Sequence, residues 1–151
     1  MTLNVTKMVT AVRTQAAASL GVSNIQDAVN PQDVSALPAE VFAFSIGEGS
    51  IEVGPAVLDH TATFPVTLYY GKAFTNGTAE TDNVVRTKLD ALANALATKP
   101  STWTVTDNGK IVRCEPGAVE VGGGDAYSAL FRETEAPYSA GSLTVMLTAI
   151  V

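Results

Sequence analysis

Charged residues are scarce in this sequence, and basic residues are fewer than acidic ones. Of 151 residues, 9 are Lys or Arg and 15 are Asp or Glu, so charged residues make up 16% of the chain, against a usual share of about 25%. The basic residues are scattered between Lys7 and Arg132 with no run among them. Binding to nucleic acid through its phosphates depends on clustered Lys and Arg. The scatter and the net charge of −6 therefore argue against a partner of that kind.

Cysteine and histidine are nearly absent. One cysteine, Cys114, excludes an intrachain disulfide and a metal site built from several cysteines. One histidine, His60, excludes a metal site with two histidine ligands. A serine or cysteine nucleophile activated by histidine would have to use His60. We place His60 in a solvated loop between two strands and assign it no catalytic role.

Long apolar runs are absent as well. No stretch approaches the ~20 apolar residues of a membrane-spanning helix, so we expect no contact with a membrane. The first 15 residues have polar residues distributed among the apolar ones and contain no continuous apolar segment of the kind a signal peptide has. These absences predict synthesis in a cytoplasm.

The few patterns that suggest chemistry are incomplete. Gly122–Gly124 resembles a phosphate-binding loop but lacks the Gly-Lys-Ser/Thr ending. The pairs Glu48 with Glu52 and Glu133 with Glu135 lack the spacing of a calcium loop, and we interpret them as solvated carboxylates. The sequence therefore predicts no cofactor, no metal and no catalytic residue. An enzyme built on carboxylates alone would require the fold to bring two of them together.

Two segments have the spacing of amphipathic helices. Residues 4–20 form the first, with Gly21 at the expected stop. The second spans residues 82–98, with N-cap chemistry in Thr81 and Asp82. The apolar stripe of this second helix consists of Val85, Leu89, Leu92 and Leu96.

Alternating apolar residues predict the strands. They are residues 41–46, a short continuation at 51–53, residues 61–70, a hairpin around Asp107-Asn108-Gly109, and the charge-free stretch 139–151. Pro65 cannot donate a ladder hydrogen bond, so we expect it on an edge or at the start of the paired region. The last stretch has apolar residues on both faces and should lie at the centre of a sheet or have partners on both faces.

These elements predict an α+β fold in one domain spanning residues 1–151, with a mainly antiparallel sheet packed against two helices. Irregular segments or loops are expected near residues 21–40, 71–80 and 115–126.

The order of these elements resembles that of the tail-terminator (tail-completion) proteins of long-tailed bacteriophages. The resemblance covers nearly the whole chain and is a match of pattern without a sharp signature motif. The matching segments are the opening helix Val5 to Leu20, the approach Leu37-Pro38-Ala39-Glu40-Val41-Phe42, the strand Thr61 to Tyr70, the helix Val84 to Ala97, a hairpin, and the closing strand Leu143 to Thr148.

The resemblance implies a structural protein of the virion, made in the host cytoplasm, that forms a hexameric ring. Such a ring caps the tail tube, ends its polymerisation and joins the tail to the head connector. Its partners would be copies of itself, the tail tube protein and the head–tail connector protein. DNA would pass through the pore without specific binding, which suits an acidic chain.

By the same analogy, the strands around Thr61–Tyr70 and Thr144–Val151 would build the contacts between subunits. The candidate interface residues are Thr67, Tyr69, Leu143, Val145, Leu147 and Ile150. The loops Gly71–Gly77 and Gly117–Asp125 would contact neighbouring rings. A core role without any interface explains the same strand residues.

Two alternatives stay open. One is another neck or tail ring protein, such as a head-closure, connector or minor tail protein. The other is a monomeric domain that binds a small ligand in a pocket lined by Tyr69, Trp103 and Tyr127.

Overall fold

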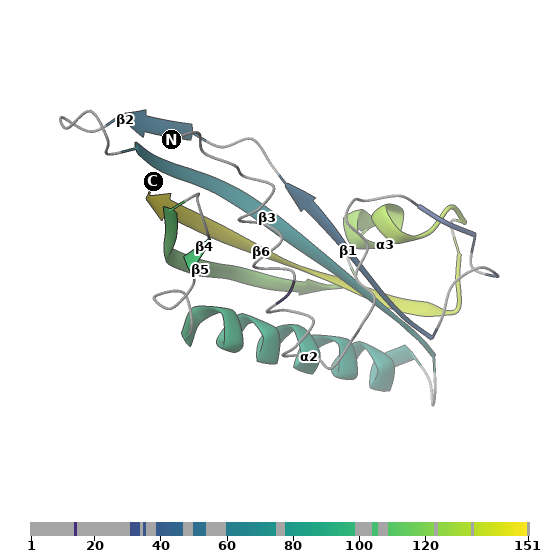
Figure 1. The fold of residues 1–151 in the computed structure, drawn as a ribbon. Coiled ribbons are helices and arrows are strands. Elements are labelled where there is room, and N and C mark those ends of the chain that lie inside the picture. The colour runs from purple at the N-terminus through teal and green to yellow at the C-terminus, as the bar shows by residue number, and fades with distance from the viewer. Residues whose placement is uncertain are drawn as a thin grey trace.

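A computed structural model provides the structure of the chain. It describes residues 14, 31–33, 35, 39–46, 50–53, 60–74, 78–98, 104–105, 109–122, 124–133 and 135–150. The elements in chain order are β1 (Glu40–Ile46), β2 (Ser50–Val53), β3 (His60–Ala73), α2 (Thr78–Thr98), β4 (Thr104–Val105), β5 (Gly109–Val121), α3 (Gly124–Leu130) and β6 (Tyr138–Ile150). Figure 1 shows one sheet with α2 and α3 on opposite sides of it.

The strands form one six-stranded antiparallel sheet in the order β1-β3-β6-β5-β4, with β2 paired to β3 beyond the end of β1. The longest pairing joins β3 and β6, from Thr61 opposite Ile150 to Ala73 opposite Tyr138. The C-terminal strand therefore lies between two neighbours, as its charge-free sequence predicts. The α+β class and the mainly antiparallel sheet are confirmed.

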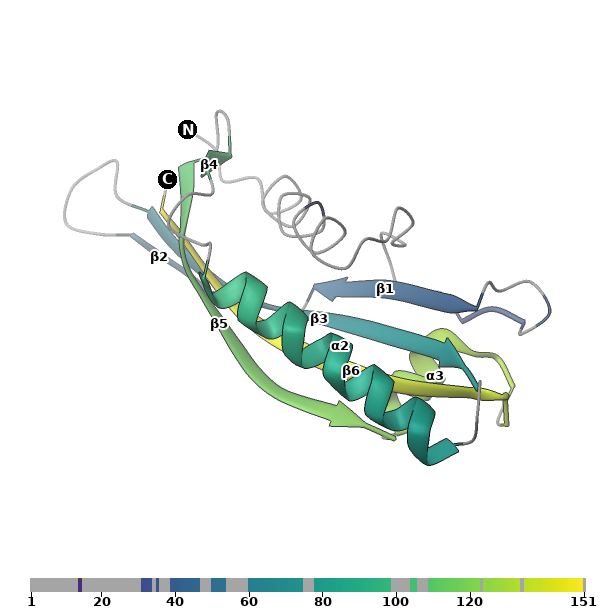
Figure 2. The same ribbon diagram turned by 90° about the horizontal axis from the view of Figure 1, so that it is seen from below.

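One face of the sheet is covered by α2, which runs along its length (Figure 2). The stripe predicted for this helix is its buried side, and the sheet residues beneath it alternate along β3 and β6 as a one-sided core requires. The buried residues of this layer are Val85, Leu89, Leu92, Leu96, Val66, Leu68, Tyr70, Leu143, Val145 and Leu147. This layer is the main core of the described fold.

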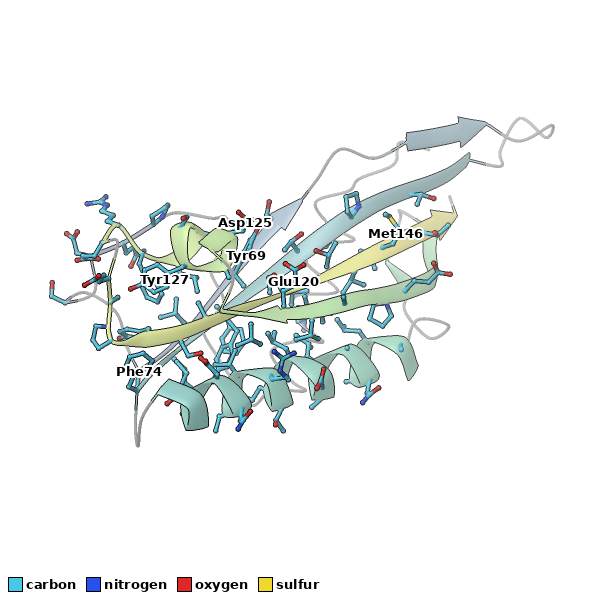
Figure 3. All side chains as sticks on the ribbon, turned by 180° about the vertical axis from the view of Figure 1, so that it is seen from behind. Tyr69, Phe74, Glu120, Asp125, Tyr127 and Met146 are labelled. Atoms are coloured by element: carbon cyan, nitrogen blue, oxygen red, sulfur yellow. The ribbon has the colours of Figure 1, made fainter. Side chains whose placement is uncertain are left out.

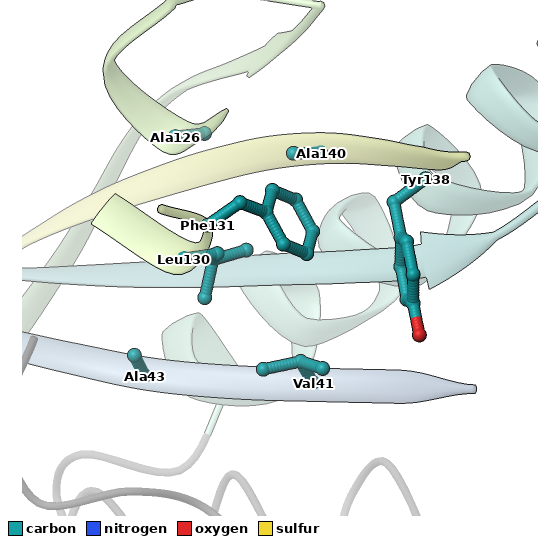
Figure 4. Close-up of a cluster of buried hydrophobic side chains, with 7 residues drawn as sticks. All are labelled: Val41, Ala43, Ala126, Leu130, Phe131, Tyr138 and Ala140. Carbon is teal, nitrogen blue, oxygen red and sulfur yellow. The ribbon is translucent and has the colours of Figure 1, made fainter. Parts of the chain in front are cut away.

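A second, smaller core lies on the other face, between α3 and one end of the sheet (Figure 4). Phe131 contacts Tyr127 and Tyr138, with ring centroids 4.8 Å and 4.9 Å apart. The buried members of this α3 cluster are Val41, Ala43, Ala126, Leu130, Phe131, Tyr138 and Ala140. Because β1 contributes to this cluster and also stacks Phe42 on Tyr70 in the α2 layer, this strand is buried on both faces.

Several predicted boundaries are wrong. The loop expected at residues 71–80 is largely structured, because β3 continues to Ala73 and α2 begins at Thr78. Thr81 therefore lies inside the helix and is fully buried, so it is not a cap. The strand extends because Gly71, Lys72 and Ala73 keep their partners on β6.

The loop expected at residues 115–126 is also wrong. β5 runs to Val121 and α3 starts at Gly124. Pro116 and Gly117 suggested a break in the strand, but the strand absorbs them in a register shift between Pro116 and Val119. The turn falls at Gly122, whose φ of 81° favours glycine.

Pro65 lies in the middle of β3 rather than at an edge or a strand start. On the side away from β6, pairing with β1 ends at Val66 and pairing with β2 begins at Thr63. The proline therefore occupies the break between two partner strands, where a missing N–H costs no ladder bond on that side.

The predicted helix at residues 4–20 and the irregular segment at 21–40 fall mostly outside the described residues. Thr14 alone of the first is described, and it is helical. The predicted hairpin is confirmed, since β4 and β5 pair antiparallel from Val105 opposite Gly109. Trp103 lies outside the described residues.

Candidate functional site

The two faces of the sheet are covered to different extents. α2 covers one face, whereas α3 covers only one end of the other. The remainder of that second face is accessible and is called the open face here. It consists of Thr63, Pro65 and Thr67 of β3 with Ser142, Thr144, Met146 and Thr148 of β6. In Figure 3, Tyr69, Glu120 and Met146 project from the side of the sheet away from α2.

Hydroxyl pairs across β3 and β6 organise the open face. The Oγ1 atoms of Thr67 and Thr144 lie 3.2 Å apart, and those of Thr63 and Thr148 lie 3.5 Å apart. These hydroxyl groups satisfy part of their hydrogen bonding within the subunit. Covering them with another surface therefore leaves fewer hydrogen-bond donors and acceptors unsatisfied. The face is therefore polar in composition but inexpensive to dehydrate.

Met146 lies between the two threonine pairs, opposite Pro65. Its side chain is 39% exposed, the same fraction as Phe74, the other large exposed apolar residue of the described chain. Threonine methyl groups, a proline ring and a thioether thus form a patch without charge on β3 and β6. Methionine adapts its shape to a partner surface readily.

Carboxylates project from the same side of the sheet as the open face, on the neighbouring strand β5. Glu115 and Glu120 of β5 are exposed and lie opposite Met146 and Ser142 in the strand register. Asp125 is exposed at the start of α3. The uncharged patch is thus bordered by negative side chains on its β5 side.

Tyrosines occupy the end of this face that α3 covers. Tyr69 and Tyr127 are half-buried against the α3 cluster. The Tyr127 hydroxyl is buried and has no hydrogen-bond partner among the described residues. Burial raises the pKa of Tyr127, and the nearby carboxylates Glu133 and Glu135 raise it further. These two tyrosines therefore belong to a packed layer.

A group of polar side chains lies at the edge of the α2 layer, around Glu40. Its Oε1 accepts hydrogen bonds from Lys88 Nζ at 2.8 Å, Tyr70 Oη at 3.1 Å and Lys72 Nζ at 3.3 Å. The hydrogen bond from Lys88 holds the pKa of Glu40 below its usual value despite partial burial. Lys88 Nζ also lies 5.5 Å from the centroid of the Tyr70 ring. With both cations paired, the group joins β1, β3 and α2 and offers no free base.

The structure corrects half of the predicted interface. Leu143, Val145 and Leu147 are fully buried beneath α2 of their own subunit, so they are core residues and are not accessible to a second chain. The alternation that separates them from Thr144 and Met146 is visible in the sequence. Which of the two faces a helix covers depends on the tertiary fold, and the sequence alone did not decide it.

Of the other predicted interface residues, Thr67 lies on the open face and Tyr69 lies beside it under α3. The side chain of Ile150 falls outside the described residues. Thr144 and Met146 are the exposed residues that the prediction missed. Of the loops expected to contact other rings, Gly71–Gly77 begins within β3, which runs to Ala73, and its residues 75–77 lie outside the described residues; Gly117–Asp125 is largely strand and helix.

The described residues hold no group of three or more His, Cys, Asp or Glu side chains placed to bind a metal ion. None of the helices described has the length and apolar character needed to cross a membrane. His60, which we expected in a loop, is the first residue of β3 and lies opposite Val53.

Comparison with known proteins gives a likeness in fold. No protein-family model matches the sequence, and no curated protein matches it significantly. Among solved structures, the chain is similar to one from the virion of a native gene transfer agent (GTA) particle, with a TM-score of 0.55 and 16% identity. The alignment covers 94% of this chain and 93% of that chain. At this identity the likeness establishes a shared fold.

Proposed function

We propose that this chain is a structural protein of a phage-like virion, and within that class a tail terminator. In this role, copies of the chain form a ring, hexameric by analogy with the family it resembles. The ring caps the tail tube, ends its growth and joins the tail to the head connector. The protein performs no catalysis and needs no cofactor.

The observation that supports this proposal most is the fold similarity to a chain of the GTA virion. The similarity extends over 94% of this chain and 93% of that one, so the two correspond as whole chains and not through a shared fragment. The likeness is to a component of a particle, and the sequence pattern independently resembles tail terminators. Fold alone does not determine function, so the proposal also depends on the surface.

The surface of the subunit supports assembly. The open face has no charged side chain on β3 or β6 and contains the exposed Met146, and Glu115 and Glu120 lie beside it on β5. The polar side chains of the Glu40 cluster are bonded to one another and join β1, β3 and α2. A ring with an acidic chain around its pore would let DNA slide without adhering.

The alternatives are another ring protein of the neck or tail and a monomeric ligand-binding domain. The first shares every feature given above and differs only in its position in the particle. The second is weakened by the packing of Tyr69 and Tyr127, two of its three proposed pocket residues, against the α3 cluster.

The absolute mass of the protein in solution tests the proposal. Light scattering behind a sizing column, over a range of concentrations, should reveal a discrete species near six subunits. Growth without limit would indicate a tube-forming protein instead. A monomer at every concentration, with or without tail tube protein added, would contradict the terminator proposal and favour ligand binding.

A further inference from the structure

The ladder of hydrogen bonds on the outer side of β3 is interrupted at one place. β6 pairs with the inner side of β3 over the whole length of β6. On the outer side of β3, pairing with β1 ends at Val66 and pairing with β2 begins at Thr63. Phe64 and Pro65 therefore lie between two partner strands and pair with neither. Pro65 also has no N–H with which to bridge the break.

The pairing of β5 with β6 is interrupted at the same level of the sheet. Its register shifts between Ile111 and Arg113, so Val112 is an extra residue in β5. Arg113 lies opposite Thr148, which in turn lies opposite Thr63 of β3. An extra residue of this kind is a β-bulge, which disrupts the ladder and bends the strand. Figure 2 shows that β5 is strongly curved.

These two interruptions lie on one line across the sheet. On one side of the line is the body, in which α2 and α3 pack on the sheet (Figure 1). On the other side is a smaller unit, called the end lobe here, which consists of Ser50–Val53, His60–Thr63, Thr104–Val105, Gly109–Ile111 and Thr148–Ile150. Among the described side chains, those of β3 and β6 buried beneath α2 stop on the body side, at Val66 and Leu147. Of the described strands, only β3 and β6 therefore run from the body into the end lobe with their pairing unbroken.

The side chains beside the line on the open face can accommodate bending. Pro65 and Met146 lie opposite each other there, and neither is charged. Met146 is 39% exposed, and a methionine side chain changes its shape readily. Thr63 and Thr148 join β3 to β6 at the line through Oγ1 atoms 3.5 Å apart. Bending at this line therefore separates no ion pair and no large packed side chain on this face.

We propose that this line is a hinge about which the end lobe turns relative to the body, and that assembly fixes the angle of the hinge. β3 and β6 form the continuous connection, and the breaks beside them remove ladder bonds that resist bending. The part of β3 in the end lobe is about 13 Å long at roughly 3.4 Å per residue, so a turn of roughly 20° moves its tip by about 5 Å. The hinge is a property of the single subunit. Only the fixing of its angle rests on the proposed function, because it requires contacts with neighbouring copies.

Distances between spin labels test the hinge. In a Cys114→Ala background, nitroxide labels are attached at Ala91→Cys on α2 and Glu52→Cys on β2, so that one label is in the body and one is in the end lobe. The matched pair is Ala91→Cys with Thr144→Cys, both in the body. Double electron–electron resonance measures each pair at concentrations below assembly, with labelled chain diluted by unlabelled chain. We expect the first distribution to be about twice as wide as the second. Equal widths would overturn the hinge.

Removing the bulge tests the position of the hinge. Deletion of Val112 removes the extra residue and makes the ladder between β5 and β6 continuous there, so it should narrow the body-to-lobe distribution. Deletion of Ala118 is the matched control, because it removes one residue from the second register shift, between Pro116 and Val119, which lies within the body. The control should leave the distribution as wide as in the unaltered chain. The same width after both deletions would overturn the position of the hinge. Because the label pairs need neither deletion, the first test stands even where a deletion prevents folding.

The assembled protein separates this proposal from the terminator proposal. In assembled copies, the distribution between Ala91→Cys and Glu52→Cys should narrow to about the width of the body pair. A distribution as wide as in the free subunit would overturn the fixing of the angle and leave both the hinge and the terminator proposal standing. A chain that stays monomeric in every preparation would contradict the terminator proposal and the fixing of the angle together. The width measured in the free subunit would still decide the hinge.

Discussion

Gly141 of β6 lies so close to Leu89 of α2 that a Cβ atom at Gly141 would stand 2.8 Å from Leu89 Cδ1. The same Cβ would stand 3.0 Å from Val85 Cγ1 and 2.8 Å from the Glu120 carbonyl oxygen. The backbone of β6 therefore touches the buried stripe of α2 directly. Glycine at this position sets how closely the helix approaches the sheet.

Gly141→Ala should consequently lower the free energy of unfolding by about 1–3 kcal/mol, the usual cost of forcing a methyl group into a filled core. Urea denaturation followed by circular dichroism measures the loss. Ser142→Ala, one residue along on the other face, is the control and should change stability by less than about 0.5 kcal/mol. An unchanged midpoint for Gly141→Ala would show that α2 is not packed as closely as described.

Much of the fold could be predicted from local pattern, and the failures have a common physical cause. Val85, Leu89 and Leu92 recur at helical spacing, so their spacing alone identifies the buried side of α2. The limits of β3 are not evident in this way, because the strand continues through Gly71 only where Ala140 pairs with it from a distant part of the chain. Local sequence patterns cannot reveal a strand partner that is so distant in the sequence.

The candidate site illustrates the same limit. Leu147 and Met146 are adjacent, and both have the apolar character expected of a buried or interface residue. Alternation places them on opposite faces, but only the position of α2 shows that Leu147 is core and Met146 accessible. The sequence did not predict α3 for a similar reason. Its seven residues are too few to show a clear helical pattern.

Leu147→Ala should destabilise the subunit by about 2–5 kcal/mol, because it empties a fully buried position beneath α2. The loss should not depend on protein concentration if Leu147 is a core residue of each subunit. Thermal or urea unfolding at two widely separated concentrations measures this. A loss that appears only at high concentration, where copies associate, would restore Leu147 to an interface. Thr144→Ala, exposed on the other face, should leave subunit stability nearly unchanged.

The Glu40 cluster predicts a dependence of stability on pH. The folded-state pKa of Glu40 is lowered by its hydrogen bond from Lys88, so the carboxylate stabilises the fold above its unfolded pKa, near 4.5. That contribution is lost as the pH falls through the folded-state value. Glu40→Gln should therefore cost about 1 kcal/mol at pH 7, a figure reduced for partial exposure. The difference between variant and unaltered chain should shrink towards pH 3. A constant difference across that pH range would mean that the charge of Glu40 does not cause the difference in stability.

Two tyrosine hydroxyls in this subunit should respond to removal in opposite ways. Tyr70 donates to Glu40 at 3.1 Å, so Tyr70→Phe removes a bond and leaves the carboxylate with fewer donors, which should cost about 0.5–1.5 kcal/mol. Tyr127 buries its hydroxyl without a partner among the described residues, so Tyr127→Phe removes an unmet polar group while its ring keeps its contact with Phe131. That change should be neutral or should stabilise the subunit by up to about 1 kcal/mol. Urea unfolding of both variants under one set of conditions compares them directly. If Tyr127→Phe lowered the free energy of unfolding as much as Tyr70→Phe does, the Tyr127 hydroxyl would have to be hydrogen-bonded in solution.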